Sequence, residues 1–154
     1  MDEKIVKLIQ IAKSLIGMPY KYGAAMSDAP NFFDCSLFTQ YIFKQVGVEL
    51  PRSTILQAEY GNEVALENIE PGDLLFLHGT QGFYNKKFLQ GIGHVILYVG
   101  DGKTIHAASE RIQENPKVIE QGAVEEQTLD HVLEKYKPLV AVKRYVWWSV
   151  EIYN

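Results

Sequence analysis

The chain has 154 residues and carries 15 Lys and Arg against 19 Asp and Glu, a net charge of −4 at pH 7. This length suits one domain with a buried core, and the hydrophobic fraction of 47% is that of a globular protein. An acidic chain does not favour the phosphate backbone of nucleic acids or an anionic membrane surface, because both select for Lys and Arg. We therefore expect a single domain over residues 1–154 and no nucleic-acid partner.

Neither a targeting segment nor a membrane span is expected. The first residues read Met-Asp-Glu-Lys and lead into an amphipathic stretch. A signal peptide would need a basic start, a continuous apolar core and a small-residue cleavage site. The apolar runs are all shorter than the roughly 18 residues that cross a bilayer.

Helical periodicity dominates the first part of the chain. Apolar residues recur at i, i+3, i+4 and i+7 through residues 2–16, and Gly17 and Pro19 follow as helix ends prefer. The next segment, 17–33, is rich in Gly, Pro and Asn and is expected to be a loop. Asp34 then occupies the N-cap position of a second periodic stretch. The helices predicted in this part are 2–16, 35–46 and 53–60.

The rest of the chain alternates short apolar or β-branched runs with turn signals. One more helix is expected at 128–136. Helices first and strands afterwards indicate an α+β fold, with the N-terminal helices packed on one face of a central antiparallel sheet. Residues 78–92 form a long loop rich in Gly and aromatic residues, and loops of this length are often functional. The predicted strands are 73–77, 94–99, 104–107, 117–119 and 139–145.

Cys35 is the only cysteine, so an intrachain disulfide is excluded. A lone cysteine is either a small buried apolar residue or a nucleophile with a histidine elsewhere. Its place in the first turn of a predicted helix favours the nucleophile, because backbone N–H groups and the helix dipole lower a thiol pKa. The neighbouring Asp34 would oppose this effect, so a nearby imidazolium would be needed.

Two histidines can supply that imidazole. His94 begins one predicted strand and His106 lies on the next, across the turn at 100–102. If the strands form a hairpin, one register places His106 opposite Ile96 and diagonal to His94 on the same face. His106 would then accept a hydrogen bond from His94, fix its tautomer and direct its other nitrogen toward Cys35. The three residues would serve as nucleophile, base and orienting group.

No cofactor or metal is expected. His78 and His131 lack comparable context and are interpreted as surface or structural residues. No pair of His or Cys residues has the close spacing of common zinc sites. No glycine-rich loop follows a strand and opens a helix, so nucleotide binding has no support.

Five blocks of the chain, in order, resemble the NlpC/P60 family of cysteine peptidases. They extend over roughly residues 5–145 and carry a Cys, a His and a second His in the family's order. The blocks are Gly17-Met18-Pro19-Tyr20-Lys21-Tyr22-Gly23, Phe33-Asp34-Cys35-Ser36-Leu37-Phe38, Leu50-Pro51-Arg52-Ser53-Thr54, Pro71-Gly72-Asp73-Leu74, and Gly93-His94-Val95 running through Tyr98 and Gly100 to Ile105-His106-Ala107.

This resemblance implies a papain-like α+β fold in which a cysteine at a helix start packs against a sheet that supplies both histidines. It implies hydrolysis of amide bonds in peptidoglycan stem peptides or muropeptides of the bacterial cell wall, often between D-γ-glutamyl and a diamino acid. It assigns Cys35 as nucleophile, His94 as base and His106 as the third polar residue.

The resemblance also suggests that Tyr20, Asp34 and Ser36 line the substrate site. In some members with dipeptide-end specificity, the matching residues hold the free amine of an N-terminal L-alanine. An anionic Asp34 would suit an ammonium group, which would give a purpose to a carboxylate beside a thiolate.

The chain also departs from the family pattern. Leu37 and Ile96 stand where the family usually has Gly, and either would narrow the cleft. The loop before His94 is longer than usual, and its Lys86 and Lys87 either offer charge to a substrate carboxylate or simply face water.

Two other functions stay open. One is acyl transfer between lipids, against which the lack of an apolar anchor or basic surface argues. The other is an inactive wall-binding module, against which the intact Cys–His–His set argues. The compartment is open as well, since a free thiol without a leader fits cytoplasmic processing of muropeptides or a trimmed or leaderless envelope enzyme. The aromatic segment 146–153 is interpreted either as an edge strand or a flap over the core, or as a surface for sugar stacking or subunit contact.

Overall fold

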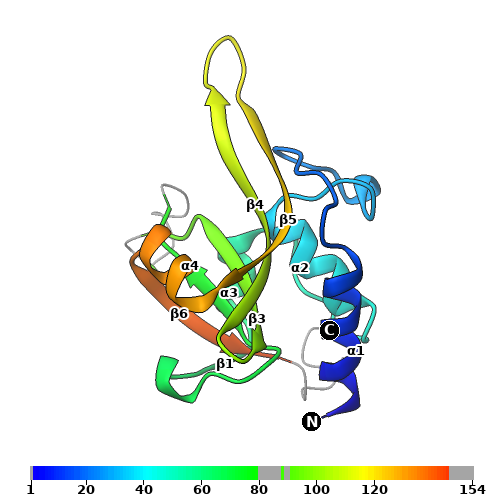
Figure 1. Cartoon of the computed structure of the whole chain (residues 1–154), viewed down its shortest axis with the longest axis vertical. Coiled ribbons are helices and arrows are strands. Elements are labelled where there is room, and N and C mark those ends of the chain that lie inside the picture. Colours follow the sequence, from blue (N-terminus) through cyan, green and yellow to red (C-terminus); the bar gives the residue numbers. More distant parts are fainter. Residues whose placement is uncertain (1, 80–87, 89–90, 146–154) are drawn as a thin grey trace.

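The computed structural model describes residues 2–79, 88 and 91–145. The N-terminal helices precede the strands in the chain, and one further helix lies before the last strand (Figure 1), so the predicted α+β class is confirmed. The elements are α1 (Glu3–Ser14), η1 (Met26–Asp28), α2 (Cys35–Lys44), α3 (Thr54–Glu59), β1 (Asn62–Glu63), η2 (Leu66–Asn68), β2 (Leu74–Leu77), β3 (His94–Gly100), β4 (Lys103–Gln113), β5 (Ile119–Thr128), α4 (Leu129–Lys135) and β6 (Leu139–Arg144).

The helix starts follow the capping residues in the sequence. The carboxylate of Asp34 accepts the N–H of Leu37 at 2.8 Å, as the N-cap prediction requires. Hydroxyl groups cap α3 and α4 in the same way, from Ser53 and Thr128. The cap of α2 matters most here, because it fixes the residue directly before Cys35.

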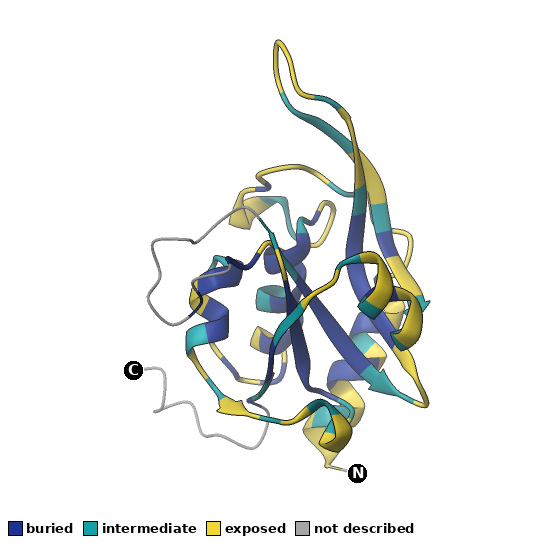
Figure 2. Ribbon diagram, turned by 90° about the vertical axis from the view of Figure 1, so that its left-hand side faces the viewer, coloured by how far each residue is buried: buried dark blue, intermediate teal, exposed yellow. Residues whose placement is uncertain are grey.

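The sheet has six strands in the order β1-β6-β2-β3-β4-β5, and every pair of neighbours is antiparallel. Successive side chains of β2 point to opposite faces. Leu74 and Phe76 join the core shared with α1, α2 and α3, whereas Leu75 and Leu77 join a second cluster with Val132 of α4. The sheet is therefore covered on both faces (Figure 2). The expected packing of the N-terminal helices on one face of the sheet is confirmed, and α4 covers the other face.

The hairpin of β4 and β5 projects beyond the body of the protein (Figure 1). It is longer than the predicted strands 104–107 and 117–119, and the prediction of β5 was wrong for most of its length. Residues 120–128 are rich in Glu and Gln and contain no apolar run. Their strand conformation depends on ten pairings with β4, from Lys103↔Thr128 to Gln113↔Ile119, which periodicity alone does not reveal.

An ion pair joins the start of β2 to the end of β6. Asp73 is 1% exposed, and Arg144 donates to its two carboxylate oxygens at 2.7 and 2.8 Å. Asp73 also accepts the N–H of Glu70 at 2.8 Å. The Asp of the Pro71-Gly72-Asp73 block is thus a structural anchor of the sheet.

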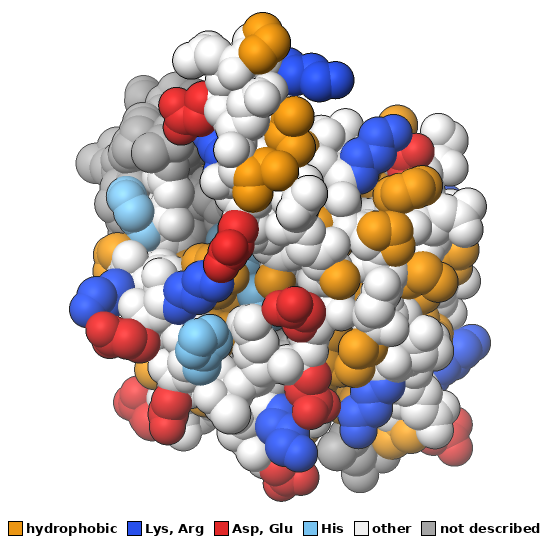
Figure 3. Space-filling view, turned by 45° about the horizontal axis from the view of Figure 1, so that its top comes forward, with side chains coloured by type: hydrophobic (Ala, Val, Ile, Leu, Met, Phe, Trp, Pro, Cys, Tyr) orange, Lys and Arg blue, Asp and Glu red, His pale blue; other side chains and the backbone are white. Residues whose placement is uncertain are grey.

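On the face seen in Figure 3, acidic and basic side chains are interspersed. None of the helices within 2–79 and 91–145 has the length and apolar character needed to cross a membrane. The predictions for Lys86, Lys87 and 146–153 lie outside the described residues.

Candidate active site

Cys35 is the first residue of α2 and is 9% exposed. Its Sγ lies 3.6 Å from the hydroxyl oxygen of Thr54. The N–H groups of Ser36 and Val95 also hydrogen-bond the sulfur. Since Val95 directly follows His94, the helix start and the start of β3 meet at this sulfur atom.

The thiol of Cys35 is not activated by this helix start alone. Its pKa is raised to about 11, mainly by burial and also by the charge of Asp34, and the hydrogen bonds from Thr54, Val95 and Ser36 only partly oppose this. The expectation that the helix start lowers the pKa is therefore wrong for the protein without substrate. Desolvation outweighs the hydrogen bonds that the sulfur receives, so formation of a thiolate requires a base that accepts the proton.

The structure brings His94 and His106 together. Nε2 of His94 lies 2.7 Å from Nδ1 of His106, and the ring planes meet at 79°. The pairing Leu97↔Ile105 belongs to the hairpin register that was expected from the sequence. His106 lies one residue beyond this pairing, level with Ile96, so the diagonal contact forms as expected.

Two residues that were not predicted from the sequence extend the row of hydrogen bonds beyond His106. Nε2 of His106 lies 2.7 Å from Oε1 of Gln127. Nε2 of Gln127 in turn donates to the carboxylate of Glu125 at 3.0 Å. Both residues belong to β5, which sequence periodicity did not identify as a strand. Once the register of β5 with β4 is known, the pairing of His106 with Glu125 identifies both residues as neighbours of the histidine.

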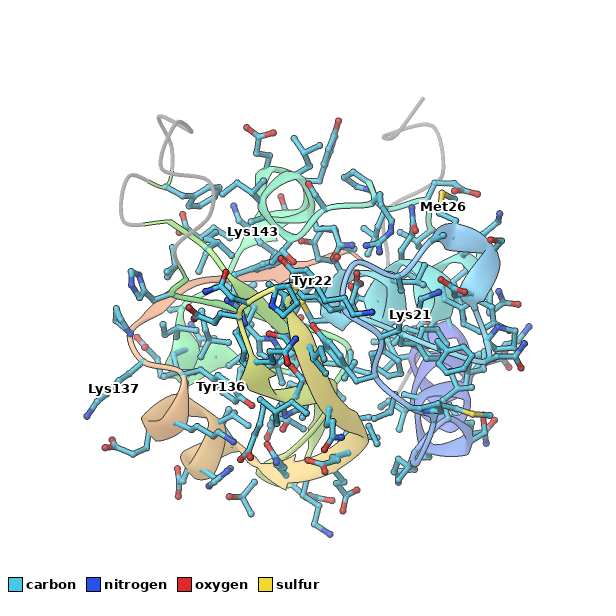
Figure 4. The ribbon with its side chains drawn as sticks, turned by 90° about the horizontal axis from the view of Figure 1, so that it is seen from above. Lys21, Tyr22, Met26, Tyr136, Lys137 and Lys143 are labelled. Carbon is cyan, nitrogen blue, oxygen red and sulfur yellow. The ribbon has the colours of Figure 1, made fainter. Side chains whose placement is uncertain are left out.

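Tyr136, at the end of α4, is a third residue that was missed. Its ring stacks on His94 at 4.6 Å between centroids and 26° between planes, and it meets His106 edge-on at 5.6 Å and 87°. Its hydroxyl oxygen is buried and has no hydrogen-bond partner in the described part of the chain. Figure 4 shows Tyr136 and Lys137 on the side of the protein that carries α4, opposite the side that carries Lys21 and Met26.

Both imidazoles are neutral in this environment. Burial, together with the neighbouring His106 and Lys135, holds the pKa of His94 well below its usual range. Burial lowers the pKa of His106 to about 4, although its hydrogen bond to Gln127 acts in the opposite direction. A neutral imidazole retains a lone pair on one ring nitrogen and can therefore accept a proton.

A pocket of about 330 Å³ opens beside the sulfur atom. It contains all three side chains that the resemblance placed at the substrate site, Tyr20, Asp34 and Ser36. Its other charged groups are Arg52, Arg111 and Glu120, and Arg111 donates to Glu120 at 3.2 Å. The full lining is Tyr20, Tyr22, Gly23, Asp34, Cys35, Ser36, Arg52, Ser53, Thr54, Gly93, Arg111 and Glu120.

Arg52 organises one end of this pocket. Its guanidinium makes a 2.6 Å ion pair with Asp34 and donates to Ser36 Oγ at 2.7 Å. It also donates to the backbone oxygen of Ala24. The carboxylate of Asp34 is therefore already paired before any substrate binds, a feature that the resemblance did not indicate.

A second hollow of about 250 Å³ lies on the other face of the β4–β5 hairpin. Glu125 and Lys135 line it together with Glu110. This hollow lies on the face of the sheet that carries the two histidines, because its lining residue Lys135 acts electrostatically on both His94 and His106.

The remaining expectations divide. His78 and His131 are exposed, as expected for surface residues. Leu37 and Ile96 do not narrow the cleft, because they pack into the two core clusters and neither lines the pocket at Cys35. Within the described residues, no group of three His, Cys, Asp or Glu side chains is arranged to hold a metal ion.

Comparison with known proteins gives a consistent family. A model of the NlpC/P60 family matches residues 17–133. The gamma-DL-glutamyl hydrolase of Bacillus subtilis (strain 168) is 38% identical over 109 residues, which covers 70% of this chain and 24% of that protein. The chain thus spans about a quarter of the length of this relative.

Solved structures agree in fold. A protein of the NLP/P60 family from Staphylococcus aureus, described as similar to lipoprotein, has a TM-score of 0.69 at 25% identity and covers 95% of this chain and 42% of that one. The NlpC/p60 domain of the peptidoglycan hydrolase SagA has a TM-score of 0.65 at 25% identity, with 90% and 97% covered. Because the family model extends over most of its length, the chain belongs to the NlpC/P60 family of cysteine peptidases.

Proposed function

We propose that this chain hydrolyses amide bonds of peptidoglycan stem peptides or muropeptides, with Cys35 as nucleophile, His94 as base and His106 as the group that orients His94. The observation that carries the proposal is the placement of one buried thiol at a helix start against the first residues of β3, with the His94–His106 pair at the same strand end. The relatives named endopeptidase and gamma-DL-glutamyl hydrolase support the reaction class.

The chemistry follows from two neutral groups. The thiol proton of Cys35 passes to His94, and the sulfur attacks the carbonyl carbon of the substrate amide. The tetrahedral intermediate collapses when His94 returns the proton to the leaving nitrogen, which releases an amine and leaves a thioester. Water, deprotonated by His94, then attacks the thioester, so that the acid is released and the thiol restored.

The substrate side of the proposal concerns the pocket at Cys35. Tyr20, Asp34 and Ser36 are proposed to bind the stem peptide on the acyl side, where a free amino terminus would meet their oxygen atoms. The alternating charges of Arg52, Asp34, Arg111 and Glu120 suit a peptide that carries both an ammonium and carboxylates. The proposed bond is D-γ-glutamyl to diamino acid, and residues 1–154 are proposed to act as one catalytic domain.

The test uses a panel of defined muropeptides, with products identified by mass spectrometry. Cys35→Ala and Cys35→Ser are expected to abolish turnover while circular dichroism stays unchanged. Undiminished turnover by purified Cys35→Ala protein would sink the proposal. Substrates with free and acetylated amino termini separate the amine-binding part of the proposal, since equal kcat/KM values for the two would remove it without touching the nucleophile.

A further inference from the structure

We propose that Glu125 and Gln127 are positioning residues that hold His94 in the tautomer with its lone pair on Nδ1. This inference deepens the proposed function, since the tautomer of His94 matters for the reaction only if His94 is the base. It rests on a continuous row of hydrogen bonds from Glu125 through Gln127 and His106 to His94.

The direction of the row is set at its outer end. A carboxylate only accepts hydrogen bonds, so the group of Gln127 that faces Glu125 must be the NH₂ donor, at 3.0 Å. The side-chain carbonyl oxygen of Gln127 then faces His106. Without Glu125, nothing in this row would distinguish the two orientations of that amide.

The orientation of Gln127 fixes the proton on His106. Its Oε1, 2.7 Å from Nε2 of His106, accepts only if that nitrogen carries a hydrogen. His106 is fully buried and neutral, so its single proton is on Nε2 and Nδ1 holds a lone pair. The next contact in the row must therefore donate to Nδ1.

That donor is Nε2 of His94, at 2.7 Å. A neutral His94 carries one proton, and this proton is used in the bond to His106. Its Nδ1 is consequently the nitrogen that can take a proton from Cys35. Reversal of the row would place the proton on Nδ1 of His94 and leave the base without a lone pair for the thiol.

Other charged groups around the two imidazoles do not set this direction. Lys135 and His131 of α4 act on His106 electrostatically, and Lys135 also acts on His94. Their effect lowers the pKa of both rings and favours their neutral forms, but none of their side chains takes part in the row. Tyr136 contacts both rings through its aromatic face or edge rather than through its hydroxyl.

The direct test is nuclear magnetic resonance of the whole protein with ¹⁵N-labelled histidine at pH 7, which distinguishes protonated from bare ring nitrogens. We expect Nε2 protonated and Nδ1 bare on both His94 and His106, assigned with His94→Gln and His106→Gln variants. A proton on Nδ1 of His94 in the wild-type protein would overturn the inference. This readout needs no substrate, so it stands apart from the test of the proposed function.

Two variants test the residues themselves. Gln127→Leu removes the amide oxygen that accepts from His106. Glu125→Lys replaces the carboxylate with an ammonium donor, which favours the opposite orientation of the Gln127 amide. Both should move part of the His106 population to the Nδ1-protonated form. The kcat should fall by about 10–100-fold, by analogy with the loss when a partner that orients a metal-binding histidine is removed, while KM changes much less.

Glu126→Lys is the matched control for Glu125→Lys. It makes the same change in charge on the next residue of β5, whose side chain is exposed and points to the opposite face. We expect wild-type tautomers and kcat for Glu126→Lys. Wild-type tautomers in folded Gln127→Leu and Glu125→Lys would overturn the role of these residues, even if their activity fell.

Discussion

The guanidinium of Arg52 lies 2.6 Å from the carboxylate of Asp34, the residue directly before Cys35. This ion pair places a positive charge against the negative charge of Asp34, which raises the pKa of the Cys35 thiol through its field. The other oxygen of the same carboxylate caps α2, so the ion pair couples the helix start to the electrostatics of the sulfur.

Substitutions in this pair should move the thiol pKa in opposite directions. Asp34→Asn retains an oxygen that can cap α2 and removes the negative charge, so the pKa of Cys35 should fall below about 11. Arg52→Gln leaves Asp34 uncompensated, so the pKa should rise. The rate of iodoacetamide alkylation as a function of pH measures both, and shifts in the same direction would contradict this account of the field.

The effect of Tyr136 on His94 should depend on its stacked aromatic ring and not on its hydroxyl group. Tyr136→Phe keeps the ring and removes a buried hydroxyl that has no described partner, so kcat should remain near the wild-type value. Tyr136→Leu admits water to His94, so the pKa of His94 should rise toward its usual range. The acid limb of kcat/KM against pH should then move to higher pH, with KM little changed. Equal losses in both variants would point to the hydroxyl instead.

Stability should depend on pH through His106. Burial lowers its pKa to about 4 in the folded protein, against about 6.5 in the unfolded chain. Between these values the unfolded state binds a proton that the folded state excludes, so the free energy of unfolding falls as pH decreases. The full loss, reached below about pH 4, is about 3 kcal/mol for this group.

Urea unfolding at a series of pH values between about 4 and 7 measures this dependence. His106→Gln should flatten it, because Gln does not titrate and still offers hydrogen-bonding groups. His94, whose pKa burial also lowers, should leave a remaining slope of the same sign. An unchanged slope in His106→Gln would show that the protonation of His106 is not linked to folding.

Gly122 should tolerate no side chain. A Cβ at this position would lie 1.9 Å from the carbonyl oxygen of Ala108 on β4 and 2.7 Å from Cα of Ser109. Gly122→Ala must therefore separate the strands and should reduce the free energy of unfolding by about 1–3 kcal/mol. Since Tyr20 N–H donates to Gly122 O at 2.9 Å, KM should increase as well. Gln121→Ala, an exposed change on the same strand, should stay within about 0.5 kcal/mol of wild type.

Local sequence signals predicted the N-terminal half of the site well. The helix start at Cys35 follows from the Asp34 cap and the apolar period after it, and the structure has α2 beginning at that residue. The hairpin register of His94 and His106 followed from the turn at 100–102. In both places the decisive information lies within a few residues of the side chain concerned.

The supporting residues were not predictable in this way. Gln127 and Glu125 lie in a polar strand, and Tyr136 at the end of a helix reaches His94 only because α4 packs on the second face of the sheet. Arg52 meets Asp34 across 18 residues of chain. Each of these contacts depends on tertiary packing, which residue types and periodicity do not encode locally.

Successive side chains of β5 point to opposite faces of the sheet, so neighbouring positions cannot exchange their roles. Gln127 and Glu125 share the face of His106, while Glu120 and Val124 point to the pocket and the core. Insertion or deletion of one residue within this stretch would exchange the two sets, turning an amide away from the imidazole and a carboxylate toward it. The same change at the exposed hairpin tip, 114–117, leaves both faces in place. Residues can therefore be added at the hairpin tip, where they would change the contacts of the tip alone. The number of residues in β5 near the histidines has to stay the same.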